Sequence, residues 1–254
     1  MSLLRRNAIR ELLQRRPFVT IRELEELFPD VSSMTLRRDI EYFEKRGEAI
    51  KVRGGARSMK FITTSMEDAF NLRLHTNSSA KERVARKALS YLETGRSIFL
   101  DSGTTVLRLA ENIPNERISV TTTGLNVALE LMKKELPIIN MVGGMVNRDN
   151  ITVTGVQSIN FLENINIDVA FIVPSGISGK DGLTCGNFSD CELKRLVVQK
   201  ARKVIVLMDA SKLNKCLPYT FAAFEEADVI ITDAEPPFDI AERARRAGIE
   251  IVIA

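Results

Sequence analysis

The sequence predicts an α/β fold, in which a mostly parallel sheet carries helices on both faces, preceded by a small and mainly helical domain. From Ser97 onward, short apolar runs rich in β-branched residues alternate with amphipathic segments of helical period. Such alternation is typical of parallel strands that are buried on both faces and joined by helices. The first sixty residues instead have a helical period that ends in two short extended pieces. The length of 254 residues suits two domains better than one.

These changes of pattern give the expected boundaries: a first domain at 1–57, a linker with a short helix at 58–78, and an α/β domain at 79–254. Strands of the α/β domain are expected at Ser97–Leu100, Ile118–Thr121, Pro137–Met141, Val169–Val173, Val204–Met208, Val229–Thr232 and Ile249–Ile253. Helices are expected at Ser79–Leu92, Thr105–Asn112, Leu125–Lys133, Gln157–Glu163, Cys191–Ala201 and Ile240–Ala247.

In the first domain, helix start and stop signals mark three helices. Pro17 stops the first helix, and Thr20 caps the second together with Glu23, three residues later, as in a capping box. Ser32 is a favourable N-cap for the third helix, which Gly47 ends. The domain is therefore expected to contain a short second helix, a tight turn and a longer third helix.

That order of elements matches a helix-turn-helix, and the segment Glu48–Ala56 with its double glycine matches a β-wing. Arg37 and Arg38 lie in the first two turns of the third helix. In a helix-turn-helix, this N-terminal end of the recognition helix reaches base edges and phosphates. One arginine can bind guanine through two hydrogen bonds, and the other is expected to contact phosphate. The expected DNA contacts are Thr20, Ser33, Thr35, Arg37, Arg38, Lys51 and Arg53.

The charge distribution supports a polyanion as the partner of the first domain. Residues 1–60 contain 14 Lys and Arg against 9 Asp and Glu, a net charge of +5, whereas the remaining 194 residues contain 22 against 24, a net charge of −2. Because the basic excess lies in the N-terminal quarter, double-stranded DNA is the expected partner. A charged, solvated helical hairpin without nucleic acid and an RNA-binding module remain alternatives.

The composition excludes several other classes of protein. No apolar run approaches the roughly 18 residues that a membrane span needs, and the N-terminus lacks the pattern of a signal peptide, so a cytoplasmic location without membrane contact is expected. Three widely spaced cysteines and the single histidine His75 form neither a disulfide framework nor a metal motif. No metal, no cofactor and no catalytic residue is therefore expected.

Several turns at predicted strand ends are rich in Gly, Ser and Thr. Asp101–Thr105 and Thr121–Gly124 each join a strand to a helix, and Gly143 and Gly144 follow a third strand. Backbone N–H groups at such turns, together with the positive end of the following helix, favour a phosphate group. In a parallel sheet the carboxyl ends of the strands line one crevice, so these turns can converge on a phosphorylated ligand.

Basic side chains near these turns add to the expected pocket. Lys212 lies just past another strand end, and Arg73, Lys81 and Arg148 are further cations that can neutralise a phosphate, although a surface ion pair explains any single one of them equally well. The expected effector contacts are Lys81, Asp101, Ser102, Gly103, Thr104, Thr105, Thr122, Thr123, Gly143, Gly144, Arg148 and Lys212.

Taken together, these pieces resemble the DeoR family of bacterial regulators over nearly the whole chain. The resemblance is carried by Thr35–Ile40, Val52–Ala56, Asp101–Thr105, Leu125–Ala128, Gly143-Gly144, Gly155, Asp168–Phe171, Gly176-Ile177, Gly182–Thr184, Lys194 and Asp209–Lys212. It implies a second domain similar to ribose-5-phosphate isomerase that senses a phosphorylated sugar. It also implies that Ser102–Thr105 hold the phosphate and that Asp101, Gly143, Gly144 and Lys212 line the same pocket.

The chain departs from the family pattern at two places. Thr122-Thr123-Gly124 stands where many members have Thr-Asn-Ser, and Val173-Pro174-Ser175-Gly176 stands where many have Gly-Ala-Asp-Gly. The isomerase uses acidic residues in the latter stretch for proton transfer, and Ser175 cannot serve as a general base without a partner. The departures therefore argue against isomerase activity.

The sequence thus predicts a ligand-controlled transcriptional regulator, expected to repress a sugar or carbohydrate operon. Two or more copies, as a homodimer or homotetramer, would bind operator DNA, because one winged helix covers little DNA. A phosphorylated sugar would shift the protein between forms that do and do not bind DNA. The alternative is a sugar-phosphate isomerase-like enzyme with an accessory N-terminal domain.

Overall fold

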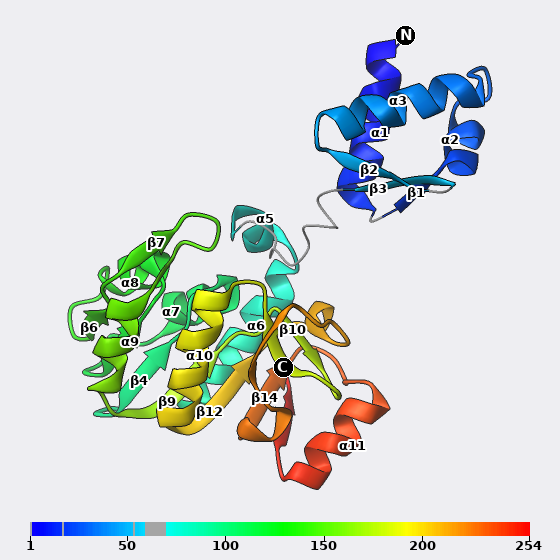
Figure 1. Cartoon of the computed structure of the whole chain (residues 1–254). Coiled ribbons are helices and arrows are strands. Elements are labelled where there is room, and N and C mark those ends of the chain that lie inside the picture. The colour runs from blue at the N-terminus through cyan, green and yellow to red at the C-terminus, as the bar shows by residue number, and fades with distance from the viewer. Residues whose placement is uncertain (1, 17, 53, 59–69) are drawn as a thin grey trace. The chain divides into compact units, whose positions relative to one another are not determined.

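The computed structural model describes residues 2–16, 18–52, 54–58 and 70–254 (Figure 1). The chain divides into two compact units, unit 1 at Met1–Met66 and unit 2 at Glu67–Ala254. Arg53 and residues 59–69 of the predicted linker lie outside the described residues. Among the described residues, no helix is both long enough and apolar enough to cross a membrane.

Unit 1 consists of helices and a small antiparallel sheet with the strand order β1-β3-β2. Its elements are α1 (Ser2–Arg15), β1 (Phe18–Thr20), α2 (Ile21–Leu27), α3 (Ser33–Lys45), β2 (Ala49–Val52) and β3 (Gly55–Ser58). The predicted capping box is present, since the Thr20 hydroxyl accepts from the Glu23 N–H and the Glu23 carboxylate accepts from the Thr20 N–H. Ser32 caps α3 as predicted.

Steric constraints explain why the wing contains two consecutive glycines. Gly54 has a φ of +88°, which disfavours side chains, and it lies in the turn between β2 and β3. A Cβ atom on Gly55 would lie 2.1 Å from the Val19 carbonyl oxygen, because β3 approaches β1 there. Strand β1 is a third strand that the sequence pattern does not predict, and its pairing with β3 attaches the wing to the helices.

A buried carboxylate joins the first and third helices of unit 1. Asp39 on α3 is only 1% exposed and accepts hydrogen bonds from the Nε atoms of Arg5 at 2.5 Å and Arg6 at 2.8 Å. Arg6 also lies 4.0 Å from the centre of the Tyr42 ring. Asp39 interrupts the apolar face formed by Leu36, Ile40 and Phe43, and these two arginines compensate its charge in the interior.

Unit 2 is built on a seven-stranded sheet with the order β15-β14-β12-β9-β4-β5-β6, in which every pair of neighbours is parallel. Its strands are β4 (Ser97–Leu100), β5 (Ser119–Thr122), β6 (Ile138–Met141), β9 (Ile167–Ile172), β12 (Ala201–Leu207), β14 (Val229–Thr232) and β15 (Glu250–Ile253). All seven predicted strands are present, with ends shifted by at most three residues. The predicted α/β class is therefore confirmed.

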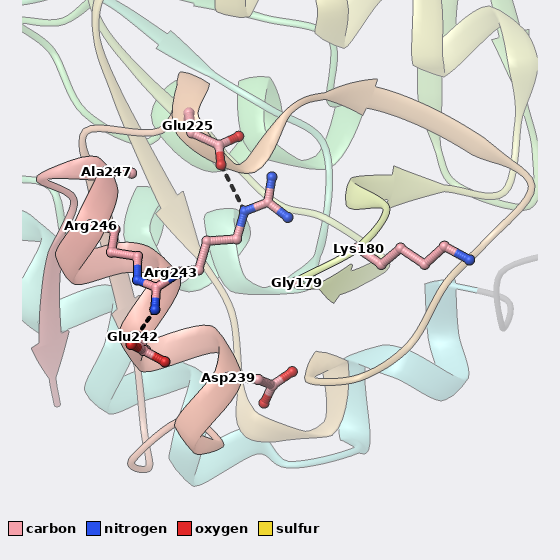
Figure 2. A pocket seen from close by; sticks show the side chains of 8 residues that line it. All are labelled: Gly179, Lys180, Glu225, Asp239, Glu242, Arg243, Arg246 and Ala247. Carbon is pink, nitrogen blue, oxygen red and sulfur yellow. Dashed lines mark hydrogen bonds and ion pairs between the residues drawn. The ribbon is translucent and has the colours of Figure 1, made fainter.

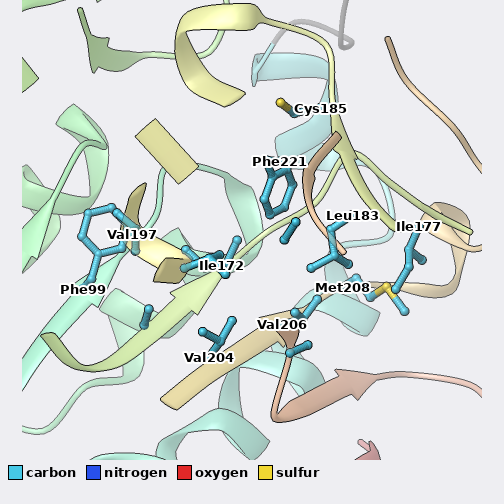
Figure 3. Packing of buried hydrophobic residues seen from close by; sticks show 14 of the residues in the cluster. Phe99, Ile172, Ile177, Leu183, Cys185, Val197, Val204, Val206, Met208 and Phe221 are labelled. Atoms are coloured by element: carbon cyan, nitrogen blue, oxygen red, sulfur yellow. The ribbon is translucent and has the colours of Figure 1, made fainter. Parts of the chain in front are cut away.

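Helices cover both faces of this sheet (Figure 1). The helical elements of unit 2 are α5 (Phe70–His75), α6 (Ser78–Ala88), η1 (Leu89–Tyr91), α7 (Thr104–Asn112), α8 (Leu125–Leu131), α9 (Val156–Glu163), α10 (Phe188–Lys200), η2 (Ala210–Lys212), η3 (Phe224–Glu226) and α11 (Phe238–Ala247). Along β4, Phe99 belongs to one apolar cluster, whereas Ile98 and Leu100 belong to another. The cluster around Phe99, Ile172 and Val197 packs beneath α10 (Figure 3), and α6, α7 and α8 pack on the opposite face.

The structure differs from the predicted pattern at several short elements. A hairpin of β7 (Met145–Asn147) and β8 (Thr152–Thr154) and an antiparallel sheet of β10 (Gly176–Ser178), β11 (Gly182–Cys185) and β13 (Tyr219–Ala222) were not expected. Strands of three or four residues are too short to show an alternating pattern. The helix expected at Cys191–Ala201 instead begins at Phe188, because Asn187 caps it by accepting from the Asp190 N–H.

The C-terminal part of the predicted linker packs on unit 2. Phe70 at the start of α5 is buried, and its N–H donates to the Asp149 carbonyl at 2.9 Å. The Asn77 side chain donates to the Asp209 carboxylate at 2.9 Å. Residues 70–78 therefore belong structurally to the α/β unit.

Substitution of Asp39 by alanine should destabilise unit 1 by about 3 kcal/mol, because it leaves two partly buried arginines without their carboxylate. Native-state hydrogen exchange of the amides in α1 and α3 of the full chain measures this loss as a lower opening free energy. Asp30→Ala, at an exposed position of the same unit, should change it by less than about 0.5 kcal/mol. Equal protection in the two variants would contradict the structural role of Asp39.

Candidate functional site

The outer face of α3 carries two exposed arginines. Arg37 and Arg38 are exposed, and neither forms an ion pair with another side chain in the described part of the chain. Met34, one turn earlier, is 62% exposed. This face therefore presents free cationic donors and one apolar side chain, which suits contacts to guanine edges, phosphates and thymine methyl groups. Met34 is not among the DNA contacts expected from the sequence.

The three predicted contacts with hydroxyl side chains have partners within the protein, whereas Arg53 lies outside the described residues. The Thr20 hydroxyl donates to the Glu23 carboxylate at 2.8 Å, and the Ser33 hydroxyl donates to Glu25. The Thr35 hydroxyl lies 3.0 Å from that of Ser32. These three side chains help to form the ends of α2 and α3 and would have to exchange partners to contact DNA.

Lys51 lies on the wing and is exposed, and its ammonium group donates to Glu41 of α3 at 2.6 Å. This hydrogen bond, together with the positive charge of Lys51, lowers the pKa of Glu41. Glu41 is therefore ionised at neutral pH. A DNA phosphate would compete with its carboxylate for Lys51.

In unit 2, a narrow cavity lies at the carboxyl ends of the central strands. It is lined by residues that follow β4 (Ser102, Thr104, Thr105), β9 (Val173, Pro174, Ser175) and β12 (Lys212), together with Arg73, Lys81, Asn150, Asp190 and Lys194. The chain runs outward from β4 to β6 and then returns to place β9 on the other side of β4. The cavity thus lies where the strand order reverses, which is the usual ligand position in open α/β sheets.

Cations from separate elements meet in this cavity. Lys81 of α6 is 4% exposed, and its ammonium group donates to the carbonyls of Arg73 at 2.5 Å and Thr76 at 2.7 Å. Burial lowers the pKa of Lys81 to about 8, and the nearby charges of Lys212 and Arg73 also lower it, whereas Asp209 raises it. A lysine held among other cations with so low a pKa favours the approach of an anion.

Asp209 supplies negative charge beside these cations. Burial, the largest single influence, raises the pKa of Asp209, but hydrogen bonds from Ser211 and Asn77 and the charge of Lys212 together bring it below its ordinary value. Asp209 is therefore ionised at neutral pH. It positions the segment before α6 by accepting from the Asn77 side chain.

The loop after β4 ends in a helix N-terminus. Gly103 has a φ of +136° and is the N-cap residue of α7, which begins at Thr104 and receives no side-chain cap. Thr104 and Thr105 are buried in the first turn of α7 and line the cavity. Backbone N–H groups in the first turn of a helix lack partners within that helix, so they can donate to an anion in the cavity.

Asp101 has a different position from the one that the sequence suggested. One of its oxygens accepts from the Ser102 N–H at 2.8 Å, and the other accepts from the Val173 N–H at 2.9 Å and from Lys194 at 2.5 Å. Lys194 also donates to the Val173 carbonyl at 2.9 Å. Both oxygens are thus engaged by the protein, and Asp101 joins the ends of β4 and β9 beneath the cavity.

The remaining predicted effector contacts lie outside the lining of this cavity. Thr122 accepts a hydrogen bond from the Gly124 N–H, and Thr123 is also buried. Gly143, Gly144 and Arg148 are exposed in the segment that contains β7. Conversely, Asn150, Asp190 and Lys194 line the cavity without having been expected there. Nothing in their sequence context marks them, because tertiary packing alone brings them to the strand ends.

A larger surface groove of about 650 Å³ lies along α11 (Figure 2). Its arginines are paired, Arg243 with Glu225 at 2.7 Å and Arg246 with Glu242 at 2.5 Å. It is open, and both of its arginines are already paired with carboxylates. The smaller cavity, where cations from several elements converge, is the stronger candidate for a ligand site.

Binding of an anion in the cavity should weaken as the pH rises through about 8, since Lys81 is charged below this pKa and neutral above it. Sulfate is a suitable probe because its own charge is constant in this range. If only the protonated lysine binds, the affinity measured by calorimetry should fall about tenfold between pH 7 and pH 9. Lys81→Arg should remove this fall in affinity with pH, because arginine stays charged. A fall in affinity of the same size in Lys81→Arg would contradict the assignment of Lys81 as the group that titrates.

The comparisons with known proteins agree with this two-part organisation. Residues 5–61 match the DeoR-like helix-turn-helix domain, and residues 76–234 match the DeoR C terminal sensor domain. The HTH-type transcriptional regulator GolR of Listeria innocua is 32% identical over 98% of both chains. The HTH-type transcriptional repressor GlcR of Bacillus subtilis is 31% identical over 97% of this chain and 94% of its own.

Two further similarities are weaker. The glycerol-3-phosphate regulon repressor of Escherichia coli K12 is 29% identical over 93% of this chain and 92% of its own. Among solved structures, ribose 5-phosphate isomerase A of Methanocaldococcus jannaschii aligns with 54% of this chain and 55% of its own, at 20% identity and a TM-score of 0.41. Because both family domains and nearly full-length relatives match, the chain belongs to the DeoR family of transcriptional regulators.

Proposed function

We propose that the protein is a repressor of a carbohydrate operon, and that a phosphorylated sugar in the cavity of unit 2 controls its binding to operator DNA. The observation that carries the proposal is that one chain combines an exposed arginine pair on a helix-turn-helix with an enclosed cationic cavity at the strand ends. One relative named as the glycerol-3-phosphate regulon repressor and another named as an HTH-type transcriptional repressor support it.

On the DNA side, α3 enters the major groove with Arg37 and Arg38 directed at base edges and phosphates. Lys51 on the wing contacts the DNA backbone after exchanging Glu41 for a phosphate. Thr20, Ser33 and Thr35 lie at the N-terminal ends of α2 and α3, where helix N-termini and short hydroxyls can bind phosphates.

On the effector side, Lys81, Lys212 and the first turn of α7 hold the phosphate of the sugar. Ser102, Thr104 and Thr105 add hydroxyl donors, and Asp190 and Asn150 on the remaining wall bind sugar hydroxyls. Asp101 acts indirectly, because it fixes the loop that carries Ser102.

The segment before α6 provides a way for effector binding in unit 2 to influence unit 1. Lys81 donates to the carbonyls of Arg73 and Thr76, and Arg73 donates to Asn150 at 3.0 Å. These residues lie in or next to α5, the first described element after residues 59–69. An anion that draws Lys81 and Arg73 into the cavity would change these contacts and hence the segment that leads to the DNA-binding unit.

We propose further that the protein is not an enzyme. Asp190 is the carboxylate in the described lining of the cavity, and it lies 3.6 Å from the ammonium group of Lys194. A carboxylate already engaged by a lysine is less available for proton abstraction from a sugar. Measurable isomerisation of ribose 5-phosphate by the purified chain would restore the alternative function.

Replacing both Arg37 and Arg38 by alanine should abolish specific operator binding while leaving the fold intact. Loss of a bidentate contact to guanine alone weakens binding by about 5- to 150-fold. A gel-shift series with duplex DNA from upstream of the gene and its neighbours measures the effect. Arg22→Ala is the matched control, since Arg22 is exposed on α2 and paired with Glu26. Unchanged affinity of the double variant would exclude α3 as the recognition helix.

Replacing Thr104 by leucine should remove the response to effector without weakening DNA binding, because the larger side chain fills the phosphate end of the cavity. A thermal-shift screen of sugar phosphates on the unmodified protein first identifies a ligand that raises the melting temperature. That ligand should then stabilise Thr94→Leu, an exposed control, but not Thr104→Leu. A normal response in Thr104→Leu would show that the ligand binds elsewhere.

A further inference from the structure

Large apolar side chains gather at one edge of unit 2. Among the described residues, six of the fourteen exposed large apolar side chains lie between residues 129 and 146. They are Leu129, Met132, Leu136, Ile138, Met145 and Val146, and each is at least half exposed. We call this group the β6 edge patch, because its residues lie on α8, on the segment that joins α8 to the edge strand β6, on β6 and on β7. Figure 1 shows these elements.

The size of the patch is unusual for a surface that stays in contact with water. Its six side chains expose on the order of 600 Å², at the upper end of the apolar patches that monomeric proteins show. With the polar atoms around it, such a surface approaches the area of about 800 Å² that each partner buries in a standard interface.

The backbone of this edge is also open. Strand β6 pairs only with β5 among the described strands, and its sequence, Ile138–Met141, contains no charge that would discourage pairing with another strand. At the opposite edge, β15 begins with Glu250, which accepts a hydrogen bond from the Tyr91 hydroxyl, and Arg83 donates to the Ala254 carbonyl that follows the strand. Charged residues thus accompany the edge strand β15, whereas the edge strand β6 itself contains none.

We propose that the β6 edge patch is the surface through which two copies of this chain associate. A contact about a twofold axis uses the same patch on both copies, so it needs a surface that does not repel itself. Both charges occur beside the patch, with Lys133 and Lys134 close to Glu130 and Glu135 in the sequence. Its apolar centre with a rim of mixed charge fits this requirement.

The inference rests on the proposed function, because a regulator that reads two operator half-sites needs two DNA-binding units. The inference adds the surface of unit 2 through which two copies of the chain associate. The oligomeric state is nevertheless measured without DNA and without effector, so it is tested independently of the proposed function.

Sedimentation equilibrium of the full chain at micromolar concentration tests the proposal. The unmodified protein should sediment as a dimer or a larger assembly. Met132→Lys and Ile138→Lys, which place a charge in the centre of the patch, should each raise the dissociation constant at least about 100-fold. Circular dichroism of both variants should match that of the unmodified protein, because the two side chains are exposed in the single chain.

Phe238→Lys is the matched control, because Phe238 is 81% exposed on α11 of the same unit and outside the patch. It should leave the mass unchanged, as should the double substitution of Arg37 and Arg38, which acts on DNA binding alone. A monomeric unmodified protein, or patch variants that keep the full mass, would overturn the proposal. Loss of assembly in Phe238→Lys alone would place the contact on α11 instead.

Discussion

The carboxylate of Asp101 accepts hydrogen bonds from Ser102 and Val173, at the ends of two adjacent strands, and from Lys194 of α10. These strands, β4 and β9, flank the point where the order of the sheet reverses. Without this carboxylate the two loops that face each other across the cavity would lose their common anchor, and Lys194 would be buried without its closest counter-charge. The geometry of the cavity therefore depends on a buried ion pair that itself lies beneath the ligand space.

A second buried carboxylate has a comparable part in unit 1. Asp39 engages Arg5 and Arg6, and Glu48 accepts two hydrogen bonds from Arg10 at 2.6 and 3.2 Å. Three of the 14 basic residues in the first sixty thus hold α1 against the remainder of the unit. The arginines on the outer face of α3 stay available, so the functional charge is smaller than the net charge suggests but is concentrated on one face.

Lys81 has two roles in the cavity, one structural and one electrostatic. Lys81 stabilises the end of α5 through two backbone carbonyls, yet burial among other cations holds its pKa near 8. An anion relieves the repulsion among these cations, and it can do so only by changing the contacts that Lys81 makes. Ligand binding and the arrangement of the segment before α6 are for this reason energetically linked, which is what a ligand-controlled regulator requires.

The sequence by itself determined the class of the fold, the helix-turn-helix with its capped helices and wing, and the loop after β4. Each of these follows from local chemistry: the period of apolar residues, the caps at Thr20 and Ser32, and glycines that the backbone requires at 54 and 55. Only the tertiary structure decided which side chains share the cavity. Asp190 and Lys194 reach it from α10 and Asn150 from the loop before β8, whereas Gly143 and Arg148 stay outside. The reason is that strand order and helix packing bring distant segments together, and no local pattern encodes those distances.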